Sequence, residues 1–373
     1  MSNKNFISPS EVKNLLHSSN NVLLVDIRAE NEYSDWNIKG SMNVPVNPFL
    51  VSGDVVQMKK MLSELPKDKH IVTICMRGIN SQVAASMLRE MNYKASTLEK
   101  GMKGWNENFD IHEIDFDSFK VIQFIRIGKG CLSYIVQCKQ TNESAVFEPS
   151  IFTDEYLAYI KEHSLKPKYV IDTHSHADHF SGAMALAEKL GVDYYVNATD
   201  FDGGFKNKNL NGVDSLTLGN IEIKIFQTPG HTDGSLSFLI NNEALICGDL
   251  LLLESVGRPD LARSSEQTVE GAKKLYTTLQ EIILKLDGNV IIFPSHFTKT
   301  DKRPVCMTLK DLGKYNDSLL INDKEQFIQF ITEHIPNTPP NYESIKKYNK
   351  AGVVVPMDYA EDLEIGPNRC AAR

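Results

Sequence analysis

The segment THSHADH, residues 173–179, constrains the fold of this chain more than any other stretch. It places four metal-ligand side chains within six residues: His174, His176, Asp178 and His179. Such a cluster is costly to leave unpaired in a fold, and a bound zinc or iron ion satisfies all four side chains. The apolar run 168–172 predicts a buried strand before the cluster, and Ala183–Leu190 predicts a helix after it. We therefore expect a metal site on a loop between a strand and a helix, with a solvated, histidine-rich turn as the alternative.

Three further candidate ligands follow apolar strands later in the chain. The Pro-Gly turn at 229–230 would direct His231 out of a sheet, Asp249 ends the apolar run 244–246, and His296 follows Phe293 and Pro294. Each alone is more typical of a cap or a hydrogen-bonded turn. Together with the first cluster they give seven candidate ligands, which we expect on one edge of the sheets.

The N-terminal part predicts an open α/β sheet of its own. Val22–Asp26 and Ile71–Ile74 are continuous apolar runs, typical of parallel strands buried on both faces. The second run leads into Cys75, a glycine-bearing loop and a helix from Gln82 to Met91. Backbone N–H groups and the helix dipole at such a position stabilise a thiolate. Cys75 is therefore a candidate nucleophile for sulfane sulfur, and a buried structural cysteine is the alternative.

Length and charge narrow the class of protein. A chain of 373 residues exceeds one compact core, and the polar stretch 110–115 suggests domains at 1–112 and 117–373. The net charge of -8 argues against a nucleic-acid surface, and no apolar run is long enough for a membrane span. Met1–Phe6 lacks the apolar core of a secretory signal, and six scattered cysteines predict free thiols. We expect a cytoplasmic protein, and its oligomeric state, including a homo-oligomer, stays open.

The first domain resembles the rhodanese family of sulfurtransferases. The resemblance is carried, in chain order, by Asp26-Ile27-Arg28, Glu32-Tyr33, Ile38-Lys39-Gly40-Ser41, Asn43-Val44-Pro45, the Cys75 loop and Gly101-Met102-Lys103-Gly104-Trp105. It implies that Cys75 carries sulfur as a persulfide and that Arg77, Gly78 and Ser81 belong to its loop. The family loop is usually C-R-x-G-x-R-S, and here Met76 and Asn80 replace the two arginines. One cation remains near the sulfur, which argues against efficient use of an anionic donor such as thiosulfate.

The second domain is similar to the metallo-β-lactamase superfamily through its four ligand motifs. This resemblance implies an α/β/β/α sandwich with the metal at one edge. In hydrolases of the superfamily, it implies two metals held by His174, His176, His231 and Asp249 on one side and by Asp178, His179, His296 and Asp249 on the other.

A closer resemblance is to the persulfide dioxygenase branch, through Gly248–Leu253, Gly257–Leu261 and the tail Gly366–Cys370. It implies one iron(II) per chain, with zinc as the alternative, and an open metal face. The implied ligands are His174, His231 and Asp249. His176, Asp178, His179 and His296 would then orient ligands and move protons. In the branch, the residue matching Arg258 helps to hold the thiol carrier; a structural ion pair with Asp260 is the alternative.

These resemblances lead to one functional hypothesis and two alternatives. The second domain would oxidise a low-molecular-weight persulfide with O2 to sulfite and thiol, and Cys75 would form or use thiosulfate. The carrier thiol, whether glutathione, coenzyme A or bacillithiol, stays open. The first alternative is a dinuclear zinc thioester hydrolase of the glyoxalase II kind, in which the metals activate a bridging water. The second is a non-enzymatic sulfur relay or sensor whose Cys75 loop serves only for docking.

Overall fold

The computed structural model describes residues 5–18, 21–261, 263–297, 300, 302–333 and 335–372. Most of Met1–Phe6, the segment tested above for a secretory signal, lies outside these residues. The chain divides into two compact units. The first contains the residues up to Phe109 together with 126–129 and 365–367, and the second contains the rest.

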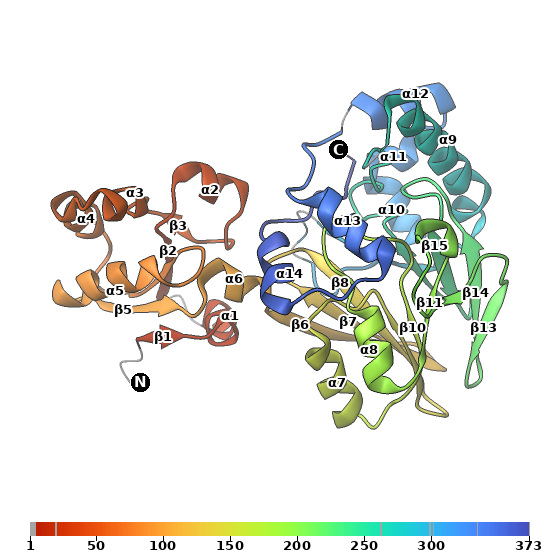
Figure 1. The fold of residues 1–373 in the computed structure, drawn as a ribbon, viewed down its shortest axis with the longest axis horizontal. Coiled ribbons are helices and arrows are strands. Elements are labelled where there is room, and N and C mark those ends of the chain that lie inside the picture. The colour runs from red at the N-terminus through yellow and green to blue at the C-terminus, as the bar shows by residue number, and fades with distance from the viewer. Residues whose placement is uncertain are drawn as a thin grey trace. The chain divides into compact units, whose positions relative to one another are not determined.

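The first unit contains an open, entirely parallel sheet in the order β1-β5-β4-β2-β3 (Figure 1). Its strands are β1 Phe6–Ile7, β2 Val22–Asp26, β3 Met42–Asn43, β4 His70–Ile74 and β5 Lys94–Leu98. Its helices are α1 Pro9–Ser18, α2 Glu30–Asp35, α3 Asn47–Ser52, α4 Val55–Leu62, α5 Asn80–Glu90 and α6 Gly101–Asn106. Successive residues of β2 enter different apolar clusters, with Leu24 on one face and Val25 on the other. Burial on both faces explains why the central strands are continuous apolar runs.

The second unit contains two sheets. The seven-stranded sheet has the order β12-β11-β10-β9-β8-β7-β6, and the six-stranded sheet has the order β13-β14-β15-β16-β17-β18. The strands of the first are β6 Phe109–Asp115, β7 Phe119–Arg126, β8 Cys131–Cys138, β9 Glu143–Phe147, β10 Lys166–Ile171, β11 Asp193–Val196 and β12 Lys208–Asn209. Those of the second are β13 Ser215–Leu218, β14 Ile221–Gln227, β15 Leu236–Ile240, β16 Ala244–Gly248, β17 Ile291–Pro294 and β18 Met307–Thr308.

The two sheets face each other across one apolar core, and helices cover their outer faces. Aromatic pairs cross the core: the ring centroids of Phe147 and Phe238 are 5.1 Å apart, and those of Tyr134 and Phe293 are 5.6 Å apart. The helices are α7 Thr153–Glu162, α8 Ala183–Leu190, α9 Ser265–Glu281, α10 Leu309–Tyr315, α11 Asp317–Leu320, α12 Lys324–Glu333, α13 Tyr342–Ala351 and α14 Met357–Leu363, with short 3₁₀ turns at Ala198–Asp200 and Ile283–Lys285. In Figure 1, α7 and α8 lie on one outer side and α9 and α12 on the other. The predicted α/β/β/α sandwich is confirmed.

Strands β6 and β15 are among those that differ from the sequence interpretation. Residues 110–115 were expected to form a polar joint, but they belong to β6, an edge strand of the seven-stranded sheet. Their burial alternates along the strand, and Glu113 accepts hydrogen bonds from Lys120 and Tyr159. Charged side chains are typical of edge strands, so polarity alone does not identify a linker. Strand β15 was not predicted. Among the described residues, no helix combines the length and the apolar character required to cross a bilayer.

The strand ends position the candidate ligands. β10 ends just before the THSHADH segment, β14 before the His231 turn, β16 before Asp249 and β17 before His296. Gly248 permits the close approach of two of these ends. It has a φ of +57°, and a Cβ atom there would lie 2.3 Å from Oγ1 of Thr173. A side chain at this position would separate Asp249 from the THSHADH segment.

Candidate metal centre

Three side chains from both sheets of the second unit converge on one point. His174 follows β10, His231 follows β14 and Asp249 follows β16. Nε2 of His174 lies 3.7 Å from Oδ2 of Asp249, and Nε2 of His231 lies 3.6 Å from the same oxygen. One ligand atom from each residue lies within 4.8 Å of the other two, a separation suited to a shared ion.

Hydrogen bonds orient both imidazoles toward this point. Nδ1 of His231 lies 2.7 Å from the carbonyl oxygen of Arg258, and Nδ1 of His174 lies 2.8 Å from Oγ1 of Thr173. The opposite nitrogens therefore face Asp249. Nε2 of His174 and Oδ2 of Asp249 are buried without a hydrogen-bond partner. Orphaned buried polar atoms are rare, so two that face each other fit a metal ion.

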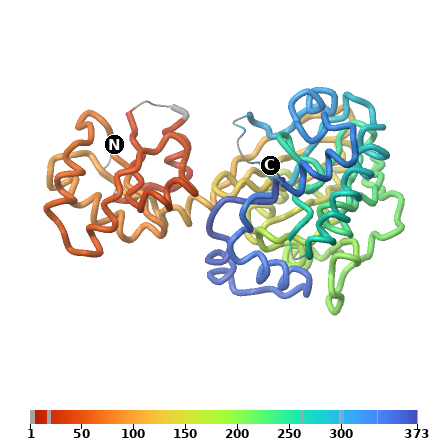
Figure 2. Tube along the Cα trace, turned by 90° about the horizontal axis from the view of Figure 1, so that it is seen from above, coloured from red at the N-terminus to blue at the C-terminus, as the bar shows by residue number. Residues whose placement is uncertain are grey.

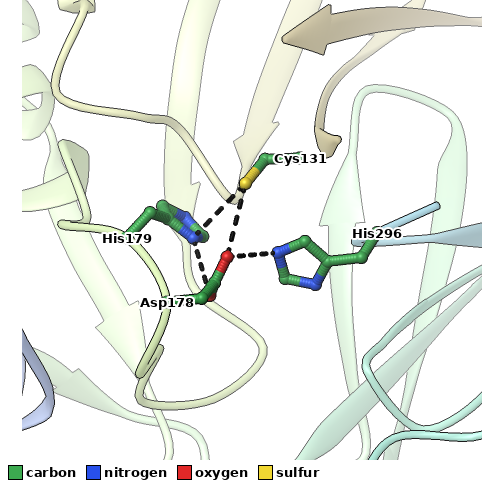
Figure 3. A group of neighbouring side chains, drawn as sticks. All are labelled: Cys131, Asp178, His179 and His296. Carbon is green, nitrogen blue, oxygen red and sulfur yellow. Dashed lines mark hydrogen bonds and ion pairs between the residues drawn. The ribbon is translucent and has the colours of Figure 1, made fainter. Parts of the chain in front are cut away.

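A second group of side chains lies next to the first and pairs within itself. It consists of Cys131, Asp178, His179 and His296, shown in Figure 3. Asp178 accepts a hydrogen bond from Nδ1 of His179 at 3.0 Å, and its other oxygen lies 2.9 Å from Nε2 of His296 and 3.4 Å from Sγ of Cys131. Nδ1 of His296 lies 2.5 Å from Oδ1 of Asp249, which connects the two groups.

The directions of the pKa shifts also distinguish the two groups of side chains. Burial, followed by the charge of His176, lowers the pKa of His174 well below its ordinary value, and burial also lowers the pKa of His231. Burial opposes ionisation of Asp249, but the charge of His296 and its hydrogen bond hold the pKa of Asp249 below its usual range. Neutral imidazoles with an ionised carboxylate are the protonation states that bind metals.

The second group shows the opposite pattern. Burial disfavours the charged forms of His179 and His296, but the nearby carboxylate of Asp178 raises the pKa of both well above the ordinary value. Burial likewise opposes ionisation of Asp178, and the two imidazoles lower its pKa well below the usual range. Asp178 is thus the common carboxylate partner of both imidazoles in this group.

His176 lies between the first group and a buried acid. Its Nε2 is 3.4 Å from Oε2 of Glu148 and 3.8 Å from Oδ1 of Asp172. Burial lowers the pKa of His176, but the charge of Glu148, together with the hydrogen bond and charge of Asp172, makes the net shift upward. Glu148 also accepts hydrogen bonds from Thr173 and Ser295, the residues that precede His174 and His296. Of the predicted ligands, His176 is thus directed toward Glu148.

Two family models match consecutive parts of the chain. Residues 8–108 match the rhodanese-like domain, and residues 126–296 match the metallo-beta-lactamase superfamily. The chain therefore joins a rhodanese-like domain to a metallo-β-lactamase domain. Both resemblances predicted from the sequence are confirmed.

Relatives agree with this assignment. Over 172 residues the chain is 31% identical to "Persulfide dioxygenase ETHE1, mitochondrial" of Mus musculus, a match that covers 45% of this chain and 65% of that protein. Less than two thirds of that relative is therefore matched. A metallo-beta-lactamase from Staphylococcus aureus has a TM-score of 0.59 and 26% identity, covering 65% of this chain and 75% of that chain. ETHE1 from Myxococcus xanthus has a TM-score of 0.53 and 23% identity, covering 65% and 99%, and supports the fold alone.

The rhodanese-like domain presents Cys75 at the end of β4, directly before α5. The Cys75 side chain is buried, and the N–H of Ser81 donates to its Sγ at 3.4 Å. Gly78 turns the loop with a φ of +74°, and a Cβ atom there would meet Lys100 N at 2.9 Å. Arg77 is exposed. Asn80, at one of the two arginine positions of the family loop, donates through Nδ2 to Oδ1 of Asn47 at 2.6 Å. Of the predicted loop residues, Ser81 contacts the sulfur of Cys75, and Gly78 forms the turn between them.

Arg258 lies within the metallo-β-lactamase domain with a fully buried side chain. Its Nε and Nη2 donate to the two oxygens of Asp260 at 2.7 Å each, and its Nη1 donates to the carbonyl oxygens of Asn337 and Arg369. The predicted contact of Arg258 with a thiol carrier stays a prediction, and the geometry favours the alternative of a structural ion pair.

Cys131 and Cys370 are among the residues near the centre that were not predicted from the sequence. Cys131 begins β8, which runs antiparallel to β9 and therefore starts at the edge where β9 and β10 end. The position of Cys131 at the start of this strand was the feature of the sequence that could have identified it. Cys370 is buried in the C-terminal tail, and its sulfur lies within 4.8 Å of ligand atoms of Asp249 and His296. The tail reaches this position through an antiparallel bridge between Gly257 and Ala371, for which the sequence held no local signal.

Proposed function

We propose that the chain is a persulfide dioxygenase coupled to a sulfurtransferase. The metallo-β-lactamase domain would oxidise the outer sulfur of a low-molecular-weight persulfide with O2, and the rhodanese-like domain would transfer sulfane sulfur through Cys75. The similarity to the mouse persulfide dioxygenase supports the first part. The six free cysteines of the described chain are consistent with the cytoplasmic location that we also propose.

One observation carries the proposal of a single metal ion. His174, His231 and Asp249 converge on one point, where Nε2 of His174 and Oδ2 of Asp249 are buried without a hydrogen-bond partner, whereas Asp178 lies within hydrogen-bond or ion-pair distance of His179, His296 and Cys131. Two imidazoles and one carboxylate form the ligand set of non-haem iron(II) oxygenases, which leaves positions for reactants. Iron(II) bound by these residues would supply the redox chemistry that allows O2 to react with sulfur.

The proposed reaction balances with water as the third reactant. RSSH, O2 and H2O give RSH, sulfite and two protons: the sulfane sulfur loses four electrons, and O2 gains them. The protein residues would have two tasks. His174, His231 and Asp249 would hold the ion, and the series Asp249–His296–Asp178, linked at 2.5 and 2.9 Å, would carry protons away from the sulfur. Burial of this series limits the access of bulk water.

Cys75 would perform the second step. Its thiolate attacks the outer sulfur of RSSH, which forms a Cys75 persulfide and releases RS⁻. Sulfite then attacks that outer sulfur, which yields thiosulfate and regenerates the Cys75 thiolate; the reverse direction uses thiosulfate as donor. The N–H of Ser81 and the N-terminus of α5 would stabilise the thiolate in each case.

Metal analysis combined with oxygen uptake tests the proposal. We expect one iron per chain and rapid O2 consumption with sulfite formation on addition of glutathione, coenzyme A or bacillithiol persulfide, and the ranking of the three identifies the carrier. Two zinc ions per chain, no oxygen uptake and hydrolysis of a glutathione thioester would instead establish the dinuclear hydrolase. That alternative has one structural argument: all seven of its predicted ligands belong to neighbouring groups, in each of which the ligand atoms lie within 4.8 Å of one another.

A further inference from the structure

Asp200 connects the two loops that carry the proposed histidine ligands. It ends the short 3₁₀ turn Ala198–Asp200 and is 8% exposed. The N–H of Ser175 donates to its Oδ2 at 3.3 Å, and Oγ1 of Thr232 donates to the same oxygen at 2.5 Å. The N–H of Gly234 donates to Oδ1 at 2.8 Å. Ser175 directly follows His174 and Thr232 directly follows His231, so one carboxylate holds the neighbours of both ligands.

The surroundings of Asp200 fit this connection closely. A Cβ atom on Gly234 would lie 2.7 Å from Cγ of Asp200, so glycine is needed for the carboxylate to reach the His231 loop. Thr232 is also fixed by Ser235, whose Oγ lies 2.6 Å from Thr232 Oγ1. A backbone hydrogen bond from Leu236 to Thr173, at 2.9 Å, joins the same loops independently of Asp200. The fold can therefore persist without the carboxylate. Its removal would eliminate the three hydrogen bonds that set the spacing of the two loops.

A carboxylate that links two ligand loops affects a metal site through the spacing of the ligands. His174 and His231 must keep their Nε2 atoms near Asp249, and a shift of a few tenths of an ångström in either loop weakens a coordinate bond. Residues that orient ligands without touching the ion typically contribute a 10- to 100-fold effect on metal affinity. Asp200 is not part of any group of described side chains whose ligand atoms lie close enough together to share an ion, so it acts on the centre through the loops.

We propose that Asp200 is a positioning residue that sets the distance between His174 and His231 and thereby the metal affinity of the centre. This inference rests on the proposed metal site. Since Asp200 lies outside the ligand motifs, neither family match nor the sequence pattern assigns it a role. Asn349 has a related task on the other side of the loop: its Nδ2 donates to the carbonyl oxygens of His176 and His179 at 2.9 and 2.8 Å. In Figure 2, the blue C-terminal part of the chain runs beside the yellow-green part of the second unit.

Cobalt(II) binding to the full-length chain tests the proposal without relying on activity. Wild type and Asp200→Asn are freed of metal and titrated anaerobically with Co(II) against a competing chelator, while the d–d absorption bands are followed. The asparagine keeps the shape of the side chain but replaces one acceptor with a donor, which faces the N–H of either Ser175 or Gly234. We expect Asp200→Asn to weaken Co(II) binding by about tenfold or more and to change the absorption bands. Thr232→Val, which removes one of the three bonds, should have a smaller effect in the same direction.

The matched control is Asp202→Asn, two residues further along. Asp202 is exposed and pairs with Lys350 at 3.3 Å, outside the ligand loops. The Co(II) affinity of the Asp202→Asn variant should therefore stay within about twofold of wild type. Thermal unfolding of the metal-free proteins separates structure from positioning. If Asp200→Asn lowers only the melting temperature of the metal-free chain and binds Co(II) like wild type, the proposal is overturned.

A different set of results would contradict the proposed metal site itself. If wild type binds no Co(II), or if His231→Ala leaves the Co(II) affinity unchanged, the site is absent and the role of Asp200 is overturned together with it. Co(II) binding that depends on His231 but not on Asp200 overturns only the positioning role. A loss in Asp200→Asn and Thr232→Val that is not additive in the double variant supports one shared connection.

Discussion

Oδ1 of Asp249 and Nδ1 of His296 lie 2.5 Å apart, and this contact leaves only Oδ2 of Asp249 to face His174 and His231. The carboxylate is thus divided between two tasks. One oxygen is paired with the self-contained second group, and the other is a free ligand atom. A second ion bound through Oδ1 would compete with His296 for this oxygen.

The first prediction follows from this division. His231→Ala should reduce bound metal from one ion per chain to a trace, because one of three ligands is lost. His296→Ala should retain a metal ion with affinity reduced by about tenfold, since it removes only an orienting partner. Metal content after gel filtration, measured by plasma emission, distinguishes the two variants. Equal and complete loss in both would show that His296 is itself a ligand.

Cys131 provides a second prediction. Its Sγ lies 3.4 Å from Asp178 and 3.7 Å from His179, inside the group that would hold a second ion. With a single ion at His174, His231 and Asp249, cobalt-loaded protein should lack a thiolate-to-cobalt charge-transfer band from Cys131. Cys131→Ser should then leave both the spectrum and the metal stoichiometry unchanged. A near-ultraviolet band that disappears in Cys131→Ser would support the dinuclear alternative with sulfur as a ligand.

The sulfur loop of the rhodanese-like domain gives a third prediction. Cys75→Ser should abolish thiosulfate formation and the mass increase of one sulfur atom on treatment with glutathione persulfide, while oxygen uptake remains. Asn80→Arg should increase the rate with thiosulfate by about tenfold, because a cation near the sulfur attracts a dianion. Asp54→Asn, at the N-cap of α4, is the control for a general effect of charge. Unchanged thiosulfate formation in Cys75→Ser would favour the docking role for this loop.

Arg258 gives a fourth prediction, which separates its two interpretations. If Arg258 is a buried structural partner of Asp260, Arg258→Ala should reduce the free energy of unfolding by about 3 kcal/mol. The exposed pair of Lys273 and Glu270, 3.5 Å apart, provides the control: Lys273→Ala should cost less than about 0.5 kcal/mol. Urea unfolding checks both values. A raised KM for persulfide in Arg258→Ala without any loss of stability would instead support contact with the thiol carrier.

His70 gives a pH prediction for the rhodanese-like domain. Burial, followed by the charge of Lys94, lowers the pKa of His70 below its ordinary value. A histidine with a lowered folded-state pKa resists protonation, so its contribution destabilises the fold as the pH falls through the unfolded-state value of about 6.5. The melting temperature of this domain should therefore fall between pH 7.5 and 5.5, and by less in His70→Gln. An equal fall in both proteins would exclude His70 as the cause.

The sequence was sufficient for the elements that obey local rules. The apolar run at Val22–Asp26 and the helix Ala183–Leu190 followed from burial and periodicity, and the ligand motifs followed from strand ends. It was insufficient where a residue's role depends on a distant partner. Cys370 comes near Asp249 only through the bridge of Ala371 to Gly257, and Asp200 gains its contacts only when the His174 and His231 loops meet. The polar edge strand β6 resembled a linker because only its pairing with β7 identifies it as a strand.

The origin of the three proposed ligands has a kinetic consequence. His174 extends from the seven-stranded sheet, whereas His231 and Asp249 extend from the six-stranded sheet. An ion held by all three therefore bridges the two halves of the sandwich, and neither half alone offers a complete site. Metal should then be captured only late in refolding, after the sheets have docked. In a strong chelator, its escape should be no faster than the transient separation of those sheets.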